Sequence, residues 1–213
     1  MKPDNPYDKW YAGEDFYCGK TPSPICDKVI EAVQPTPDFR PMLLDLGCGE
    51  GRNAIYFAKN GFDVVGIDVS KPGVAKVRSY AAETGVEVKV ILADILTYEI
   101  DEQYDVVFSV ATLQYLPPEI RDARFEQFKQ ATRPGGINAH SGFVKKPFIP
   151  KSPDGEPTGN SYKSGELFGF YWDWEILYCT EDIFDCNSAG VPHKHACNRI
   201  IALRPIQEGS AAS

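Results

Sequence analysis

The sequence has 213 residues and a mass of 23.7 kDa, enough for one α/β domain and too little for two ordinary ones. Its formal net charge of -8 argues against an extended nucleic acid partner, because a phosphate backbone binds to a cationic track. No apolar run approaches the roughly 20 residues of a membrane span, and the first residues lack the apolar stretch of a secretory signal. We therefore expect one domain over residues 1–213, no nucleic acid or membrane partner, and a cytoplasmic location.

The six cysteines are scattered along the chain, with no Cys-x-x-Cys pair and no spacing typical of metal ligands. This distribution favours reduced thiols and predicts no metal site. The cysteines are Cys18, Cys26, Cys48, Cys179, Cys186 and Cys197.

Residues 1–40 are predicted to flank the domain, with a helix from Pro22 to Val33 that Pro35 ends. Strands and helices then alternate, which implies right-handed crossovers. This pattern predicts an α/β fold with a Rossmann-like, doubly wound, seven-stranded and mostly parallel sheet, and helices on both faces. The predicted strands are 42–46, 62–67, 86–92, 104–109 and 137–144, and the predicted helices are 52–60, 71–83 with Ser70 as N-cap, and 118–132.

The C-terminal part breaks this alternation. Residues 145–160 contain four prolines and few apolar residues, which predicts a long loop. We interpret 144–163 as a loop on the substrate side of the domain. A short helix near 163–169 follows, and the segments 174–183 and 195–203 are predicted to close the sheet as an antiparallel hairpin.

A glycine-rich loop follows the first strand, in the segment Asp45-Leu46-Gly47-Cys48-Gly49-Glu50-Gly51. Glycines let a ligand approach the backbone closely, and the helix that starts near Arg52 adds a positive dipole end. Arg52 stands where a dinucleotide-binding loop has its third glycine. Asp45 would repel a pyrophosphate but can accept hydrogen bonds from an amino group.

Two more aspartates follow strands in the same way. Asp68 ends the second strand, about 20 residues after the loop, where a carboxylate can hold ribose hydroxyls. Asp94 follows the third strand. Because the carboxyl ends of parallel strands meet at one edge of the sheet, we expect Asp45, Asp68 and Asp94 to line one crevice.

The segment from Asp45 to Asn53 resembles the cofactor loop of class I S-adenosylmethionine-dependent methyltransferases, and the segments 61–68, 104–109 and 132–136 follow in the order typical of that family. The resemblance implies S-adenosylmethionine as cofactor and S-adenosylhomocysteine as product. It implies that the amides around Gly47 and Gly49 hold the methionine part, that Asp68 holds the ribose, and that Asp94 and Ile95 lie at the adenine. The implied cofactor-binding residues are Tyr17, Asp45, Gly47, Cys48, Gly49, Arg52, Asn53, Asp68, Val69, Asp94, Ile95 and Ser109.

More narrowly, the chain resembles the tellurite-resistance, thiopurine-like branch of these enzymes. The similarity lies in residues 51–58, in Gly165-Glu166-Leu167 and in the last two strands, and Tyr17 resembles part of an N-terminal lid. The branch implies a small-molecule methyl acceptor such as a thiol or a chalcogen oxyanion. Members that act on tellurite carry a His-Arg pair where this sequence has Phe184-Asp185, which argues against tellurite itself.

A soft acceptor needs only orientation, whereas an oxygen acceptor needs a base. His140 and His195 are the candidate catalytic residues, and His193 shares one strand face with His195. Two other functions stay open: a nicotinamide-dependent oxidoreductase, and a protein that binds S-adenosylmethionine without catalysis. The sequence identifies neither the acceptor nor the oligomeric state.

Overall fold

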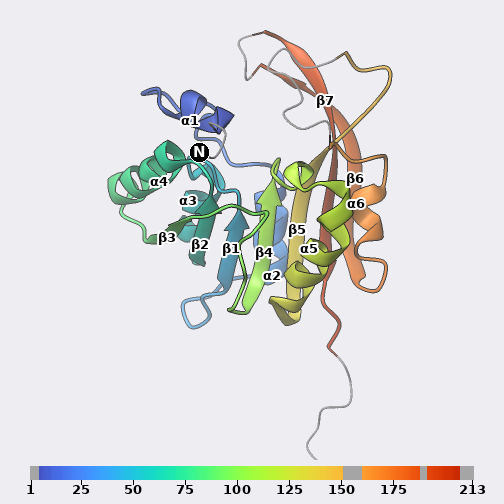
Figure 1. The fold of residues 1–213 in the computed structure, drawn as a ribbon. Coiled ribbons are helices and arrows are strands. Elements are labelled where there is room, and N and C mark those ends of the chain that lie inside the picture. Colours follow the sequence, from blue (N-terminus) through green and yellow to red (C-terminus); the bar gives the residue numbers. More distant parts are fainter. Residues whose placement is uncertain (1–4, 151–159, 188–190, 207–213) are drawn as a thin grey trace, which may run out of the picture.

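The computed structural model describes residues 5–150, 160–187 and 191–206, and its centre is one seven-stranded sheet (Figure 1). The strand order is β3-β2-β1-β4-β5-β7-β6. The strands are β1 (Met42–Leu46), β2 (Asp63–Asp68), β3 (Val88–Leu92), β4 (Tyr104–Val110), β5 (Thr132–Val144), β6 (Glu175–Cys186) and β7 (His193–Leu203).

The first five strands are parallel, and β7 runs antiparallel to both β5 and β6. The chain reverses direction in sheet order beside β1, with β2 on one side and β4 on the other. This arrangement opens a crevice at the carboxyl ends of the strands, where ligands bind in doubly wound folds. The predicted fold class is confirmed.

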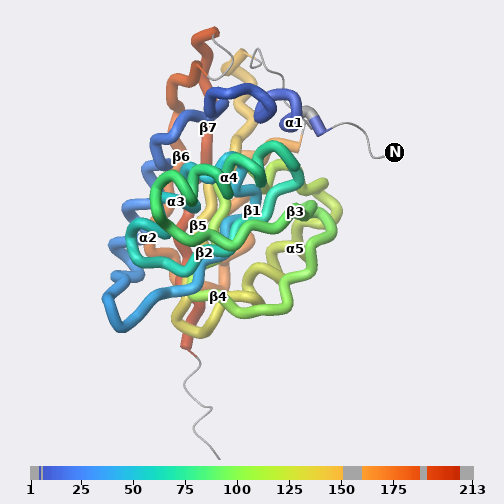
Figure 2. Tube along the Cα trace, turned by 90° about the vertical axis from the view of Figure 1, so that its left-hand side faces the viewer, coloured from blue at the N-terminus to red at the C-terminus, as the bar shows by residue number. Residues whose placement is uncertain are grey.

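Helices cover both faces of the sheet. One face carries α2, α3 and α4, whose apolar residues pack against the sheet, and the other carries α5 and α6. Figure 2 shows α2, α3 and α4 together on one side. The helices are α1 (Pro6–Tyr11), α2 (Ile25–Val33), α3 (Arg52–Lys59), α4 (Lys71–Thr84), α5 (Pro118–Gln130) and α6 (Glu166–Gly169), with a short 3-10 turn η1 (Leu113–Tyr115).

The sequence predicts most of these elements, and two differences affect the region around the site. Ser70 caps α4 as expected, since its side chain accepts a hydrogen bond from the Gly73 amide. Helix α1 was not predicted. Strand β5 begins at Thr132 and not at residue 137, because Thr132 already pairs with Tyr104 before a register shift in that pair of strands.

Two segments stand over the carboxyl-end edge of the sheet in Figure 1. Helix α1 lies beside α4 on one side, and the hairpin of β6 and β7 extends past the ends of the parallel strands on the other. The carboxyl ends of the parallel strands, where ligands bind in doubly wound folds, lie between these two segments. Among the described residues, no helix combines the length and apolar character that a membrane span requires.

Candidate active site

The glycine-rich loop adopts backbone conformations that favour glycine at three positions. Gly47, Gly49 and Gly51 have φ values of +77°, +56° and +92°. A Cβ atom on Gly47 would lie 2.3 Å from the side chain of Thr112, which follows β4. The loop is therefore tightly packed, and its residue types are dictated by space as well as by conformation.

The amides of this loop are already bonded inside the protein. Gly47 and Cys48 both donate to the carbonyl oxygen of Ile67 at 2.9 Å, and Gly49 donates to Asp68 Oδ2 at 2.8 Å. That the amides around Gly47 and Gly49 hold the methionine part stays a prediction, and in this structure these two amides themselves have partners within the protein. They hold the loop against the end of β2.

Asp68 lies at the centre of these contacts. Its Oδ1 accepts a hydrogen bond from the Ser70 amide at 2.8 Å, so both carboxylate oxygens are oriented by the backbone. Burial raises the pKa of this carboxyl, and the amides of Ser70 and Gly49 oppose that shift by stabilising the charge. An oriented carboxylate at the end of β2 suits the hydroxyls of a ribose.

Asp45 is buried at the end of β1 and lacks a complete set of partners. Its exposed fraction is 1%, and its Oδ2 has no hydrogen-bond partner among the described residues. Burial, and secondly the nearby charge of Asp68, raise the pKa of Asp45 to about 8. A buried carboxyl oxygen without a donor fits a ligand that brings a cationic amino group, so the residues present suit the amino acid part of S-adenosylmethionine.

The N-terminal segment covers this crevice. Asp8 on α1 accepts a hydrogen bond from the Ser70 hydroxyl at 2.6 Å. The hydroxyls of Tyr7 and Tyr115 form a hydrogen bond with each other. Tyr11 is buried against Gly49, with its hydroxyl oxygen 3.1 Å from where a Cβ of that glycine would lie.

Sequence reasoning missed helix α1 itself and its residues Tyr7 and Asp8. The signal was present, because Asn5 precedes a proline at the first helical position and its side chain caps the Tyr7 amide. Tyr17, which was predicted, belongs to the same covering segment and stacks on Trp10 with ring centroids 5.1 Å apart.

Two other predicted cofactor residues anchor this segment. Arg52 donates to the Cys18 carbonyl oxygen at 3.2 Å. Asn53 is buried and accepts a hydrogen bond from the Ser23 amide at 2.9 Å. Its amide oxygen therefore points to the start of α2, and the structure gives Asn53 a role in holding the N-terminal segment.

The predicted adenine side lies beyond β2 and β3. The Ala93 amide donates to the Asp68 carbonyl oxygen at 2.9 Å, which brings the two strand ends together. Asp94 accepts a hydrogen bond from the Leu96 amide at 3.0 Å, and Ile95 is buried. Val69 is 41% exposed beside them, so an apolar surface is available next to Asp68.

Two predicted residues do not reach the crevice. Ser109 has no exposed surface, and its hydroxyl donates to the Leu46 carbonyl oxygen at 2.8 Å inside the sheet. The side chain of Cys48 is buried against Gly66, and burial raises the pKa of its thiol well above the usual value. Both side chains pack in the core, and a contact of these residues with the cofactor stays a prediction.

His140 also lies in the core. It has no exposed surface and packs against Phe125, Phe128 and Tyr171 under α5. Burial lowers its pKa to about 3, so the ring is neutral at ordinary pH. The prediction of His140 as a catalytic base is wrong, because no acceptor can reach it.

His195 lies on the outer part of β7, partly exposed, with its ring stacked on Phe143 at 4.5 Å. Its Nε2 is 2.9 Å from Nε2 of His193, so the two rings share one strand face as predicted. Of the predicted loop at 144–163, residues 151–159 lie outside the described residues. Its ends are joined where the Lys145 amide donates to the Tyr162 carbonyl oxygen at 2.9 Å.

Comparison with known protein families decides the relationship. The family model described as tellurite resistance protein TehB matches residues 10–200. The chain belongs to the TehB family. This confirms the methyltransferase branch that the glycine loop and the last strands predicted.

Two related sequences are longer than this chain. It is 32% identical over 159 residues to hemagglutinin 1 of Eikenella corrodens, covering 73% of this chain and 50% of that protein. It is 28% identical over 171 residues to a probable S-adenosylmethionine-dependent methyltransferase TehB of Haemophilus influenzae, covering 80% and 58%. The chain thus spans between half and three fifths of the length of these relatives.

Solved structures agree on the fold. The crystal structure of Haemophilus influenzae TehB matches with a TM-score of 0.75 at 23% identity, covering 93% of this chain and 65% of that one. The magnesium protoporphyrin IX methyltransferase of Synechocystis, solved with S-adenosylmethionine, matches with a TM-score of 0.61 at 16% identity, covering 84% and 76%. The TehB-family chain has the fold of S-adenosylmethionine-dependent methyltransferases.

Proposed function

We propose that this TehB-family chain is an S-adenosylmethionine-dependent methyltransferase that acts on a small molecule. The observation that carries the proposal is the pair of carboxyls at the ends of β1 and β2. Asp45 is buried with an oxygen that lacks a donor, and Asp68 is oriented by two amides. A ligand with a cationic amino group and a ribose complements both. Family membership and named methyltransferase relatives support the same function.

Different residues of the chain would bind different parts of the cofactor. Asp45 would accept hydrogen bonds from the amino group, and Asp68 from the ribose hydroxyls. Val69, Asp94 and Ile95 would border the adenine, where one side is apolar and exposed. Gly47 and Gly49 let the side chains of Thr112 and Tyr11 pack directly against the loop, which fixes its shape.

Methyl transfer does not require the protein to form a covalent bond with the substrate. When bound, S-adenosylmethionine supplies an electrophilic methyl group whose leaving group departs neutral. The protein then has to align an acceptor with that methyl group and exclude water. Tyr7, Tyr11 and Trp10 on α1 form an aromatic cover over the crevice, which serves the second need.

The acceptor is proposed to be soft, a thiol or a chalcogen oxyanion. The description of the family supports a chalcogen acceptor, and a soft nucleophile needs orientation more than a base. If the acceptor reacts through oxygen, His195 stays the candidate base, because it is partly exposed on the hairpin that borders the crevice. A cytoplasmic location stays a proposal drawn from the composition alone.

Calorimetric titration with S-adenosylmethionine and, separately, with NAD tests the cofactor. We expect micromolar-range binding of the first and none of the second. Binding of NAD alone would replace the proposal by the oxidoreductase alternative. Formation of S-adenosylhomocysteine with a panel of thiols, selenite and tellurite then separates an enzyme from a protein that only binds the cofactor, and no product with any acceptor would favour the latter.

A further inference from the structure

The outer end of the β6–β7 hairpin brings together three side chains that can ligate a metal. Cys186 is paired with His193 across the two strands, and His195 follows two residues later on the same face. The sulfur of Cys186 and one ring nitrogen of each histidine all lie within 4.8 Å of one another. Each of the three residues is partly exposed, so an ion can reach them.

The ring of His193 is held in the orientation that metal ligation requires. Its Nδ1 lies 2.7 Å from the Val191 carbonyl oxygen, which can only accept a hydrogen bond. Nδ1 therefore carries the proton, and Nε2 presents its lone pair toward Nε2 of His195 at 2.9 Å. A histidine whose second nitrogen donates to a carbonyl is the usual arrangement around bound zinc.

The ring of His195 is fixed by aromatic neighbours. It stacks on Phe143 of β5 with centroids 4.5 Å apart, and Phe184 of β6 lies 5.9 Å away on the neighbouring strand. The two histidine rings are thus held in place by neighbouring residues before an ion binds. This lowers the conformational entropy that is lost on binding.

We propose that Cys186, His193 and His195 form a binding site for Zn²⁺ with three protein ligands and a fourth position open to water. A thiolate and two neutral imidazoles are the ligands that zinc prefers, and three-ligand sites keep a free coordination position. Tetrahedral zinc with Zn–N bonds of about 2.0–2.1 Å sets the two nitrogens roughly 3.3 Å apart. The rings need to separate by only a few tenths of an ångström.

The site lies at the edge of the sheet that carries the candidate active site. Phe143, on which His195 stacks, follows two residues after Ser141, and the Ser141 carbonyl oxygen accepts a hydrogen bond from the Ala111 amide at the end of β4. An ion there would connect the outer ends of β6 and β7 to each other. The metal site does not depend on methyl transfer itself, but a His195 that binds zinc cannot also serve as the base for an oxygen acceptor.

Cysteine spacing alone does not reveal this group, because the other two ligands are histidines on the opposite strand. The prediction of no metal site rested on cysteine pairs, and the hairpin register is what brings Cys186 beside the two histidines.

The test uses the full chain, stripped of metal with a chelator and then titrated with Zn²⁺ in competition with a chromophoric chelator. We expect each chain to bind one Zn²⁺ ion with high affinity. Co²⁺ in its place is expected to give the intense visible bands of a tetrahedral site and a near-ultraviolet thiolate-to-cobalt band. Cys186→Ser should remove the thiolate band. Cys186→Ser and His195→Ala should each weaken Zn²⁺ binding by at least about 100-fold, because loss of a group outside the ligand set already costs up to about that factor.

Two matched variants control for nonspecific binding. Cys179→Ser removes an exposed thiol from the same strand, and Lys194→Ala alters the residue between the two histidines on the opposite strand face. Both should bind Zn²⁺ like the parent chain, and circular dichroism checks that all variants are folded. No tight equivalent in the parent chain, or equal loss in Cys179→Ser and Cys186→Ser, would overturn the site. In that case the short distance between the rings of His193 and His195 reflects a hydrogen bond from an N–H group of one ring to a nitrogen of the other.

Discussion

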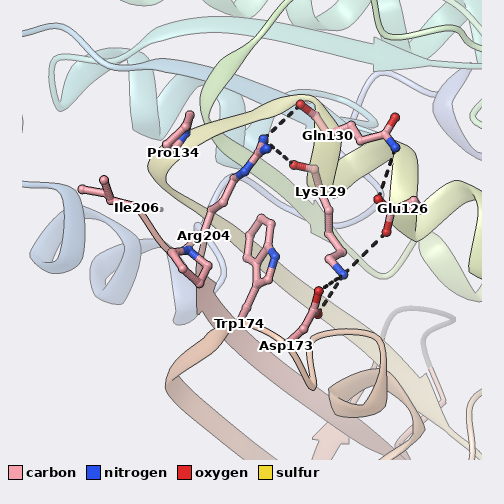
Figure 3. A pocket seen from close by; sticks show the side chains of 9 residues that line it. Glu126, Lys129, Gln130, Pro134, Asp173, Trp174, Arg204 and Ile206 are labelled. Atoms are coloured by element: carbon pink, nitrogen blue, oxygen red, sulfur yellow. Dashed lines mark hydrogen bonds and ion pairs between the residues drawn. The ribbon is translucent and has the colours of Figure 1, made fainter. Parts of the chain in front are cut away.

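The two ends of the sheet differ in how their polar groups are satisfied. At the end opposite the glycine loop, a cavity of about 440 Å³ is lined by charged side chains that pair with one another (Figure 3). Lys129 binds Asp173 and Glu126, and Arg204 donates to carbonyl oxygens at the end of α5. At the carboxyl end, by contrast, Asp45 keeps a buried oxygen without a donor. A buried carboxyl oxygen without a donor can be satisfied by a ligand, so we expect the ligand to bind at the carboxyl end.

The largest effect is expected from Gly47→Ala. The new Cβ would lie 2.3 Å from Thr112, at a φ of +77° that disfavours side chains, so binding of S-adenosylmethionine should be abolished and the chain destabilised by several kcal/mol. Gly85→Ala is the matched control, since its φ is +68° but no atom lies within 4 Å of the new Cβ. Urea unfolding and calorimetry measure both. Equal effects of the two variants would show that crowding at the loop is unimportant.

Asp68→Ala is expected to weaken binding of S-adenosylmethionine by about 1–3 kcal/mol, or roughly 5- to 150-fold, through loss of hydrogen bonds. Asp63→Ala, at the other end of β2 and exposed, is the control and should leave the affinity unchanged. Calorimetric titration of both gives the comparison. An unaltered affinity in Asp68→Ala would mean that the ribose lies elsewhere.

Asp45→Asn tests the raised pKa of this buried carboxyl through stability. An unfolded Asp has a pKa near 3.9 and the folded Asp45 one of about 8. Between these values the folded chain keeps a proton that the unfolded chain has lost, so the stability of the cofactor-free protein should fall as pH rises from about 4 to 8.

The variant cannot ionise, so it should be more stable than the parent near pH 8, and this gain should vanish near pH 4. Urea unfolding across this range measures the difference. Parallel pH profiles for the two chains would contradict the assigned pKa.

The smallest effect is expected at the opposite end. Lys129→Ala removes the ion pairs with Asp173 and Glu126, which lie in a partly exposed cavity. Cofactor affinity should stay within about twofold of the parent, and stability should fall by no more than about 1 kcal/mol. A marked loss of affinity, measured by calorimetry, would mean that this cavity communicates with the site.

The sequence predicts those features that depend on local chemistry. The alternation of elements, the N-cap at Ser70 and the loop between Asp45 and Gly51 are all visible in short segments. The direction of a side chain within a buried sheet is not. His140 was expected to serve as a base, but alternation along β5 turns it under α5, where Phe125 and Tyr171 cover it.

Hydrogen-bond partners that lie far apart in the sequence could not be predicted either. Asn53 is committed to Ser23, and Ser109 to Leu46, which only the folded chain shows. Helix α1 is a different case, because its capping residue Asn5 and the following proline were legible in the sequence.

The most direct test of the central claim asks whether Asp45 recognises the amino acid part of the cofactor. S-Adenosylhomocysteine carries that part and 5′-methylthioadenosine lacks it, so their affinities for the parent chain and for Asp45→Asn are compared by calorimetry. We expect the parent chain to prefer S-adenosylhomocysteine, and this preference to shrink at least tenfold, about 1.4 kcal/mol, in the variant. An equal preference in both chains would contradict the account and leave Asp45 as a buried acid without a part in binding.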